Sequence, residues 1–266
     1  MIASLAMYDQ PWLQSANDRL WSAVSARLRA AGIGDAPSEL SRDLELEQVW
    51  RSPDLLLAQS CGYPVMTELR ERVQLVATPH YEAEGCEGAF HRAAIIVRKD
   101  DPVDGIAGLR GKKAGINDWR SNTGMNLLRA AIAPLAQGEP FFDDVIVTGS
   151  HAASTAAVLS GEIDVASIDA VTLAQLRRYI PAASAVRVLE WTAATPALPL
   201  VTSIATNGAT IEALRQALRD TVSDPDIATT LQMLLISDFE VLDFADYGVI
   251  LDLARQAAAQ GYPEIR

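Results

Sequence analysis

Cysteine, histidine and basic residues are all scarce in this sequence, and each shortage narrows what the protein can be. The 266 residues include two cysteines, three histidines and 22 Lys+Arg against 34 Asp+Glu, which gives a formal net charge of −12. That charge opposes contact with nucleic acid and with anionic membrane surfaces, so we expect neither as a partner. Cys61 and Cys86 are too few for a disulfide framework, and the sequence leaves open whether they pair.

Long apolar runs are absent as well. No stretch approaches the roughly 20 residues needed to cross a bilayer. The first residues, MIASLAMYDQPW, lack the basic start, the long apolar core and the cleavage site of a secretory leader. We therefore expect a soluble monomer that does not insert into membranes and carries no export signal. What is present is 49% hydrophobic residues, enough to form the cores of one large or two modest domains.

Strand-like and helix-like segments alternate along the chain. A helical pattern at 15–32, capped by Ser15, follows the first strand-like segment, and three further strand-like segments end near residue 100. A second series of strands and helices begins after the turn-rich segment 100–111. This alternation predicts an α/β fold with mainly parallel sheets covered by helices on both faces.

The segment SNTG at 121–124 raises the question of function. It directly follows a strand-like segment and begins an apolar helical pattern. A helix that begins at the carboxyl end of a strand offers unpaired N–H groups to an anion, hydroxyls add donors, and Gly124 leaves room for the anion to approach. The alternative is that Ser121 is an ordinary helix N-cap.

A second helix start has the same design, because a strand-like segment leads into Gly149, Ser150 and His151. His151 would either donate a hydrogen bond to the same anion or cap its own helix. A third strand delivers Asp169, which would either accept a bond from a ligand amine or cap the helix at 170–179. Both alternatives stay open for both residues.

Aromatic residues follow strands in the first half of the chain. Tyr8 ends the segment AMYDQPW, and Tyr63 lies in QSCGYP. Rings and hydroxyls at strand ends are typical of clefts that bind small ligands, although ordinary loop aromatics would give the same pattern.

These segments, in the order aromatic strand end, SCGYP, SNTG, GSHAAS, GEIDVASID and LDFADYGVILDLARQA, resemble the phosphate/phosphonate-type substrate-binding proteins of ABC importers. The resemblance covers nearly the whole chain. That family has the type II periplasmic binding protein fold, in which two α/β lobes are joined by two crossover strands and a ligand cleft lies between them. It implies a first lobe of residues 1–94 plus 199–266, a second lobe of residues 95–198, and crossovers at RAAIIV and PALPLVT. The C-terminal helices at 208–256 would pack on the first lobe.

The resemblance also implies which residues bind. Ser121, Asn122 and Thr123 would hold the oxygens of a phosphonate, although Asn122 stands where a second hydroxyl is usual. His151 would join them, as would Tyr8 and Tyr63 from the first lobe. Val171 stands near where some phosphonate binders place an acidic residue for the ligand amine, and Asp169 is the candidate to replace it.

The resemblance therefore implies a solute-binding protein, periplasmic in its family, that captures a small oxyanion for an ABC permease and needs no cofactor. A cytosolic ligand sensor of the same fold is an alternative, favoured by the missing leader. An enzyme using Cys61 and His151 is a weaker one, because the histidines show no local catalytic signature. No Cys or His spacing predicts a metal site.

Overall fold

The computed structural model describes residues 1–266, which divide into two compact units. Unit 1 comprises Met1–Glu82, Glu87–Ala89 and Pro196–Asp246, and unit 2 comprises Ala83–Cys86, Phe90–Thr195 and Tyr247–Arg266. Each unit is built around its own five-stranded sheet. The predicted α/β class with two sheets is therefore what the chain adopts.

The sheet of unit 1 has the strand order β1-β2-β12-β3-β13. Its strands are β1 (Ile2–Ser4), β2 (Leu55–Gln59), β3 (Val73–Tyr81), β12 (Leu200–Ser203) and β13 (Ile236–Glu240). β1 and β2 pair in parallel, whereas β12 runs antiparallel to β2 and β3, and β13 runs antiparallel to β3. Every residue of β2 is buried, as expected for a central strand with a continuous apolar run.

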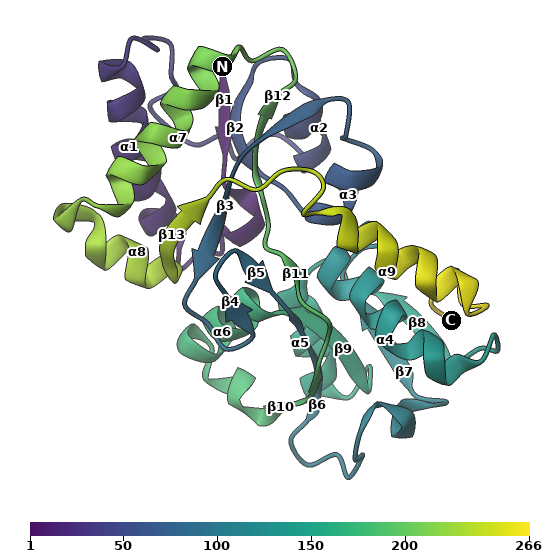
Figure 1. The fold of residues 1–266 in the computed structure, drawn as a ribbon. Helices are drawn as coiled ribbons and strands as arrows, with labels where there is room; N and C mark the ends of the chain where they lie inside the picture. The colour runs from purple at the N-terminus through teal and green to yellow at the C-terminus, as the bar shows by residue number, and fades with distance from the viewer. The chain divides into compact units, whose positions relative to one another are not determined.

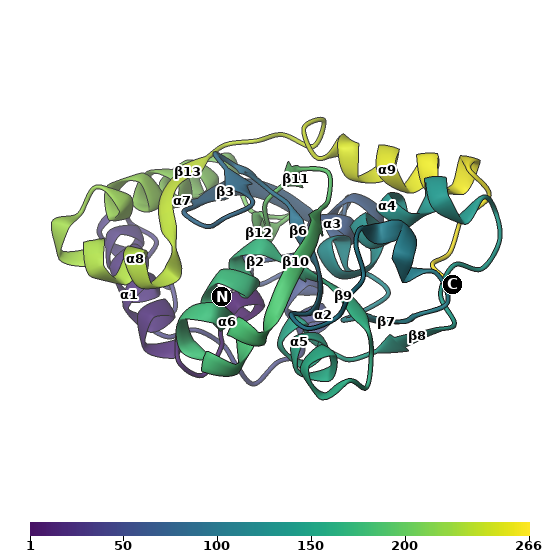
Figure 2. The ribbon, with the colours of Figure 1, turned by 90° about the horizontal axis from the view of Figure 1, so that it is seen from below.

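The helices of unit 1 are α1 (Gln14–Ala30), α2 (Leu46–Arg51), α3 (Gly62–Thr67), α7 (Gly208–Val222) and α8 (Ala228–Leu234). α1 packs against α7 and α8, which lie beside it in both ribbon views (Figures 1 and 2). The predicted Ser15 cap is wrong: the helix begins at Gln14, and Leu13 is its N-cap residue. The first helical hydrogen bond starts at Leu13, because the Asn17 N–H donates to the Leu13 carbonyl.

The sheet of unit 2 has the strand order β10-β6-β9-β7-β8. Its strands are β6 (Ala93–Arg98), β7 (Lys113–Ile116), β8 (Asp144–Val147), β9 (Val165–Asp169) and β10 (Val186–Trp191). β6 is antiparallel to both of its neighbours and β7 is parallel to both of its own, so only β6 opposes the common direction. Ile96, Val158 and Ile168 belong to the core cluster on this sheet.

The helices of unit 2 are α4 (Leu127–Ala136), α5 (His151–Ser160), α6 (Ala170–Tyr179) and α9 (Gly248–Ala259), and the π-helical turn η3 (Asn122–Asn126) precedes α4. Short 3-10 helices complete the chain: η1 (Ala6–Tyr8) and η5 (Pro225–Ile227) in unit 1, and η2 (Ile106–Leu109) and η4 (Pro181–Ala185) in unit 2. The short strands β4 (Cys86–Glu87), β5 (Phe90–His91) and β11 (Thr195–Pro196) lie where the chain passes between units.

The C-terminal helix α9 belongs to unit 2, so the prediction that all of 208–256 packs on the first lobe is wrong for this helix. α9 lies along α4 in both ribbon views (Figures 1 and 2). The Asn126 side chain donates to the Ile250 carbonyl at 3.2 Å, and Arg129 donates to the carbonyl of Pro263. The Phe141 N–H bonds the Arg266 carbonyl at 2.7 Å. These bonds explain the placement, because they satisfy buried polar groups of η3 and α4 with the C-terminal segment.

The two segments predicted as crossovers are strands within the sheets. RAAIIV contains β6 of unit 2, and PALPLVT contains β12 of unit 1. Both are antiparallel to their neighbours, as fits strands that follow a passage from the other unit. The passages lie at 82–90, 195–196 and 246–247 rather than at the predicted boundaries 94 and 199.

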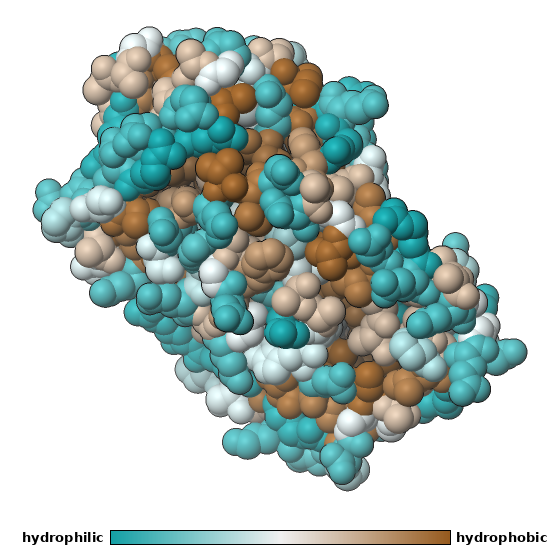
Figure 3. Space-filling model, in the orientation of Figure 1, coloured by the Kyte–Doolittle hydropathy of each residue, from teal (hydrophilic) through white to brown (hydrophobic).

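On the face drawn in Figure 3, hydrophobic residues are interspersed among hydrophilic ones. None of the helices has both the length and the apolar character that a membrane crossing requires.

Candidate functional site

The helix start predicted at 121–124 is present in unit 2. Ser121 is the N-cap, and its Oγ accepts a hydrogen bond from the Gly124 N–H at 2.9 Å. The first turn is the π-helical turn η3, closed by the Asn126 N–H on the Ser121 carbonyl at 3.0 Å. Ser121, Asn122 and Thr123 are all buried. Ser121 therefore fills the cap role, while its hydroxyl proton stays free to donate elsewhere.

Gly124 does not leave open space for an anion, contrary to the expectation from sequence. A Cβ at this position would lie 1.8 Å from Asn117 Oδ1 and 3.2 Å from His151 Cε1. The space beside Gly124 is therefore filled by the Asn117 carboxamide and the His151 ring. Glycine is needed here because these two side chains pack directly on its backbone.

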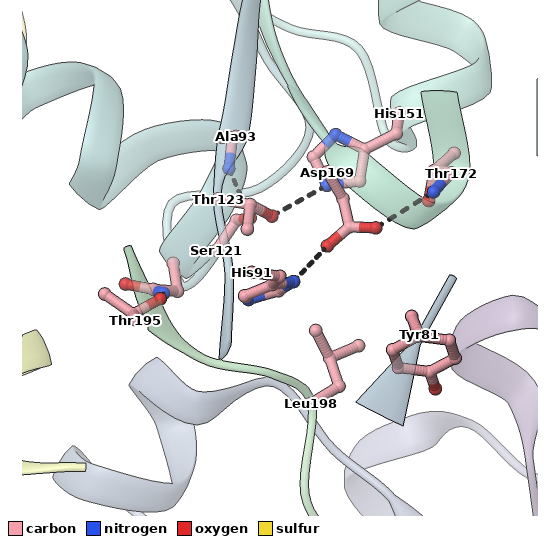
Figure 4. Close-up of polar contacts among 12 residues, drawn as sticks. Tyr81, His91, Ala93, Ser121, Thr123, His151, Asp169, Thr172, Thr195 and Leu198 are labelled. Carbon is pink, nitrogen blue, oxygen red and sulfur yellow. Dashed lines mark hydrogen bonds and ion pairs between the residues drawn. The ribbon is translucent and has the colours of Figure 1, made fainter. Parts of the chain in front are cut away.

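The start of the second helix lies beside the start of the first, because His151 contacts Thr123. Ser150 caps α5, since its Oγ accepts from the Ala153 N–H at 3.0 Å, so His151 is not the cap of its own helix. The His151 ring instead points at Thr123, with Nε2 lying 3.0 Å from Thr123 Oγ1 (Figure 4). Burial lowers the pKa of His151 below its ordinary value of 6.5, more strongly than the Asp169 charge raises it. The lowered pKa favours the neutral ring, which has one donor and one acceptor nitrogen, and Nδ1 is buried without a hydrogen-bond partner.

Asp169 is the N-cap of α6, as one of its two predicted roles required. Its Oδ1 accepts from the Thr172 N–H at 2.9 Å, and its Oδ2 lies 3.0 Å from His91 Nδ1 (Figure 4). The side chains of Asp169 and His91 are each 1% exposed. Desolvation acts to raise the pKa of Asp169, but His91, His151 and the Thr172 amide outweigh it and lower that pKa to about 2. Asp169 is thus a buried carboxylate that stays ionised.

The cluster rests on hydrogen bonds within unit 2. Ser167 Oγ donates to the Thr123 carbonyl at 2.6 Å, which ties η3 to β9. Asn122 Nδ2 donates to Thr195 Oγ1 at 3.0 Å, and Asn122 Oδ1 accepts from Asn126 at 3.1 Å. Both ends of the Asn122 carboxamide are thus bonded inside the unit, so this residue holds the turn in shape.

The tyrosines expected to contribute from the first lobe lie in unit 1. Tyr8 is buried in η1, and its ring meets Tyr81 edge-on with centroids 5.5 Å apart. Tyr63 lies in α3 and is half-buried. Tyr81, which sequence analysis did not single out, accepts from Gln59 Nε2 at 2.8 Å through its hydroxyl. That Tyr8 and Tyr63 share a site with Ser121 stays a prediction.

Basic and thiol side chains contribute little to the cluster. The Arg120 side chain is 44% exposed and pairs with Asp118 at 3.4 Å. Neither Cys61 nor Cys86 forms a disulfide. Burial and the charge of Asp169 raise the pKa of Cys86 to about 12, which makes it a poor nucleophile. No group of three or more His, Cys, Asp and Glu side chains is arranged to hold a metal ion.

Sequence reasoning missed His91 and Asn117. The sequence patterns do not single out His91, whereas in the structure it is the buried partner of Asp169. No local sequence pattern predicts the pair of His91 and Asp169, because the two residues come from strands that are distant in the sequence. Asn117 directly follows the strand that precedes SNTG, and its polar character at a strand end was a signal that could have been used.

Comparison with known proteins identifies the family of the chain and its fold. Residues 52–247 match the model of a family described as the periplasmic substrate-binding protein of phosphonate ABC transporters. No curated protein matches the chain in sequence.

Solved structures share the fold at low sequence identity. PhnD1 from Prochlorococcus marinus, solved in complex with methylphosphonate, has a TM-score of 0.74 and 14% identity, with 97% of both chains covered. A binding protein component of an ABC phosphonate transporter from Pseudomonas aeruginosa has a TM-score of 0.73 and 17% identity, covering 97% of this chain and 86% of its own. XAC2383 from Xanthomonas citri, bound to chloride, has a TM-score of 0.73 and 18% identity, with 97% of both chains covered.

Proposed function

The chain belongs to the family of periplasmic phosphonate-binding proteins of ABC transporters, and on that premise we propose that Ser121, Thr123 and His151 hold the oxyanion of its ligand. The observation that carries this proposal is the 3.0 Å contact between Thr123 Oγ1 and His151 Nε2. It joins the first turns of two helices, and helix N-termini favour anions.

The donors of this cluster suit a phosphonate or phosphate group. Ser121 accepts from the Gly124 amide and has its own hydroxyl proton to donate. Thr123 and His151 bond to each other, so an arriving oxyanion would take one donor from each by replacing that bond. One neutral hydrogen bond would thus be exchanged for two charge-assisted ones, each of them roughly twice as strong.

In this proposal no cationic side chain binds the oxyanion. Arg120 is the basic residue nearest the helix mouth in sequence, and its exposed side chain pairs with Asp118. Neutral donors fixed by backbone geometry act at short range, so we expect recognition to depend on their placement more than on net charge.

The finer role within the family is also a proposal. We infer that this chain delivers its ligand to an ABC permease in the periplasm, because that is the setting described for the family whose model covers residues 52–247. Asn122 and Asp169 would act by holding the site in shape, given their internal bonds. Tyr8 and Tyr63 remain the proposed contribution of unit 1.

Calorimetric titration of the purified protein tests the proposal. Methylphosphonate, inorganic phosphate, phosphite and sulfate are the probes, and His151→Asn is compared with His80→Asn. His80 lies in unit 1, where it pairs with Glu240 on the surface. At least one phosphorus oxyanion should bind, His151→Asn should weaken it at least tenfold, and His80→Asn should not. Equal affinities for the two variants would contradict the assignment of His151.

A further inference from the structure

Both oxygens of the Asp169 carboxylate face groups of unit 2. One oxygen accepts from the Thr172 N–H at 2.9 Å, and the other faces His91 Nδ1 at 3.0 Å. The side chains of the pair are 1% exposed. Figure 4 shows His91 on one side of Asp169 and Thr172 on the other, with His151 and Thr123 beside them.

Asp169 is also the acidic side chain that the oxyanion cluster contains. His151 lies close enough for its pKa to be affected by the charge of Asp169, and Thr123 contacts His151 directly. The residues that continue α6 add no second carboxylate, since Ala170 and Val171 are buried and apolar.

A ligand that carries an ammonium group next to its phosphonate needs a partner for that group. Moving an ammonium from water into a protein is strongly unfavourable unless a carboxylate with accessible oxygens receives it. The imidazole of His91 lies 3.0 Å from the Asp169 oxygen that does not accept from Thr172, so an ammonium would have to displace the ring to reach that oxygen.

We propose that His91 closes Asp169 to ligand amines, so that the protein selects phosphonates and related oxyanions that lack an ammonium group. This inference rests on the proposed function of the Ser121, Thr123 and His151 cluster. The substrate class is then phosphate, phosphite and simple alkylphosphonates, and aminoalkylphosphonates are discriminated against.

Two ligands of nearly equal size test this selectivity. Ethylphosphonate and aminomethylphosphonate differ by a methyl in place of an ammonium, and each is titrated in competition with methylphosphonate. Ethylphosphonate should compete at least tenfold better, and any smaller ratio overturns the inference. If neither methylphosphonate nor phosphate, phosphite or sulfate binds at all, the proposed function itself fails, which is a different result from binding without discrimination.

The role of His91 has a separate test with a matched control. His91→Asn removes the imidazole from a buried carboxylate, whereas His80→Asn makes the same change in the surface pair with Glu240. The ratio between ethylphosphonate and aminomethylphosphonate should shrink at least threefold in His91→Asn and stay unchanged in His80→Asn. An unchanged ratio in a folded His91→Asn protein overturns the role of His91. If that variant does not fold, the competition with the unmodified protein still decides the selectivity.

Discussion

The hydroxyl of Thr123 lies 3.0 Å from Nε2 of His151, and this contact joins two helix starts that are 28 residues apart in the chain. Each start is capped by its own serine, Ser121 for η3 and Ser150 for α5. The two serine hydroxyls accept hydrogen bonds from N–H groups of the first turns, so Thr123 and His151 do not act as caps and contact each other instead. The arrangement places a hydroxyl and an imidazole where helix dipoles favour negative charge.

Replacing Thr123 with Val keeps the shape of the side chain and deletes one donor. Affinity for the tightest oxyanion should fall by about 1–3 kcal/mol, because a charged oxygen would lose a hydrogen bond. Arg120→Ala should cost less, since that side chain is exposed and paired with Asp118. Calorimetry with Thr229→Val as the control, an exposed threonine on α8, checks both effects. A larger loss from Arg120→Ala would show that a charge clamp holds the anion.

The affinity of the oxyanion should fall only weakly as salt is raised. Buried hydroxyl and imidazole donors are screened little by mobile ions, whereas an exposed cation would be screened strongly. Titration in a series of NaCl concentrations measures this dependence, with sodium gluconate as a check against competition by chloride. A steep decline in both salts would contradict recognition by neutral donors.

Adding a methyl group at Gly124 should destabilise the protein by displacing the side chains that pack on this residue. In Gly124→Ala the Cβ would lie 1.8 Å from Asn117 Oδ1, so that side chain must move. We expect a loss of about 1–3 kcal/mol in the free energy of unfolding, as overpacking usually costs. Gly208→Ala is the matched control, because nothing lies within 4 Å of its Cβ.

A double variant separates this clash from other effects. Asn117→Ala removes the atoms that a Cβ on Gly124 would meet most closely. Adding it to Gly124→Ala should recover part of the lost stability in denaturant unfolding. Simple additivity of the two losses would show that Asn117 is not the obstacle.

The free energy of unfolding should depend on pH through the ionisation of Asp169. Its pKa is lowered from 3.8 to about 2 in the folded chain, so the unfolded chain takes up the proton first as the pH falls. The stabilisation is present in full above about pH 5 and is lost progressively as the pH falls through 3.8 and below 2, amounting to roughly 2 kcal/mol. Urea unfolding at a series of pH values should show this loss, and Asp169→Asn should flatten it. Asp104→Asn, at an exposed position, should leave the curve unchanged, and equal curves for both variants would contradict the account.

Local patterns predicted much of this fold. The helix at 170–179 has the bounds expected from sequence, because apolar periodicity and capping residues act within a few positions. The serine caps at both helix mouths follow from the same short-range chemistry. The placement of α9 did not follow, since an apolar face predicts burial but does not say which surface covers it.

The candidate site was predictable in part for the same reason. Ser121, Thr123 and His151 were identified from helix starts, which are local features. The partner of Asp169 is His91, which lies 78 residues earlier on β5, and the pairing of the following strand β6 with β9 brings the two together. Asn117 fills a space that the sequence suggested was open, which depends on side-chain packing that no spacing reveals.

A crystal structure of the protein with methylphosphonate tests the central claim most directly. We predict phosphonate oxygens at about 3 Å from Ser121 Oγ, Thr123 Oγ1 and a ring nitrogen of His151, with the pair between His91 and Asp169 intact. A phosphonate bound elsewhere, with the bond between Thr123 and His151 unchanged, would contradict the account.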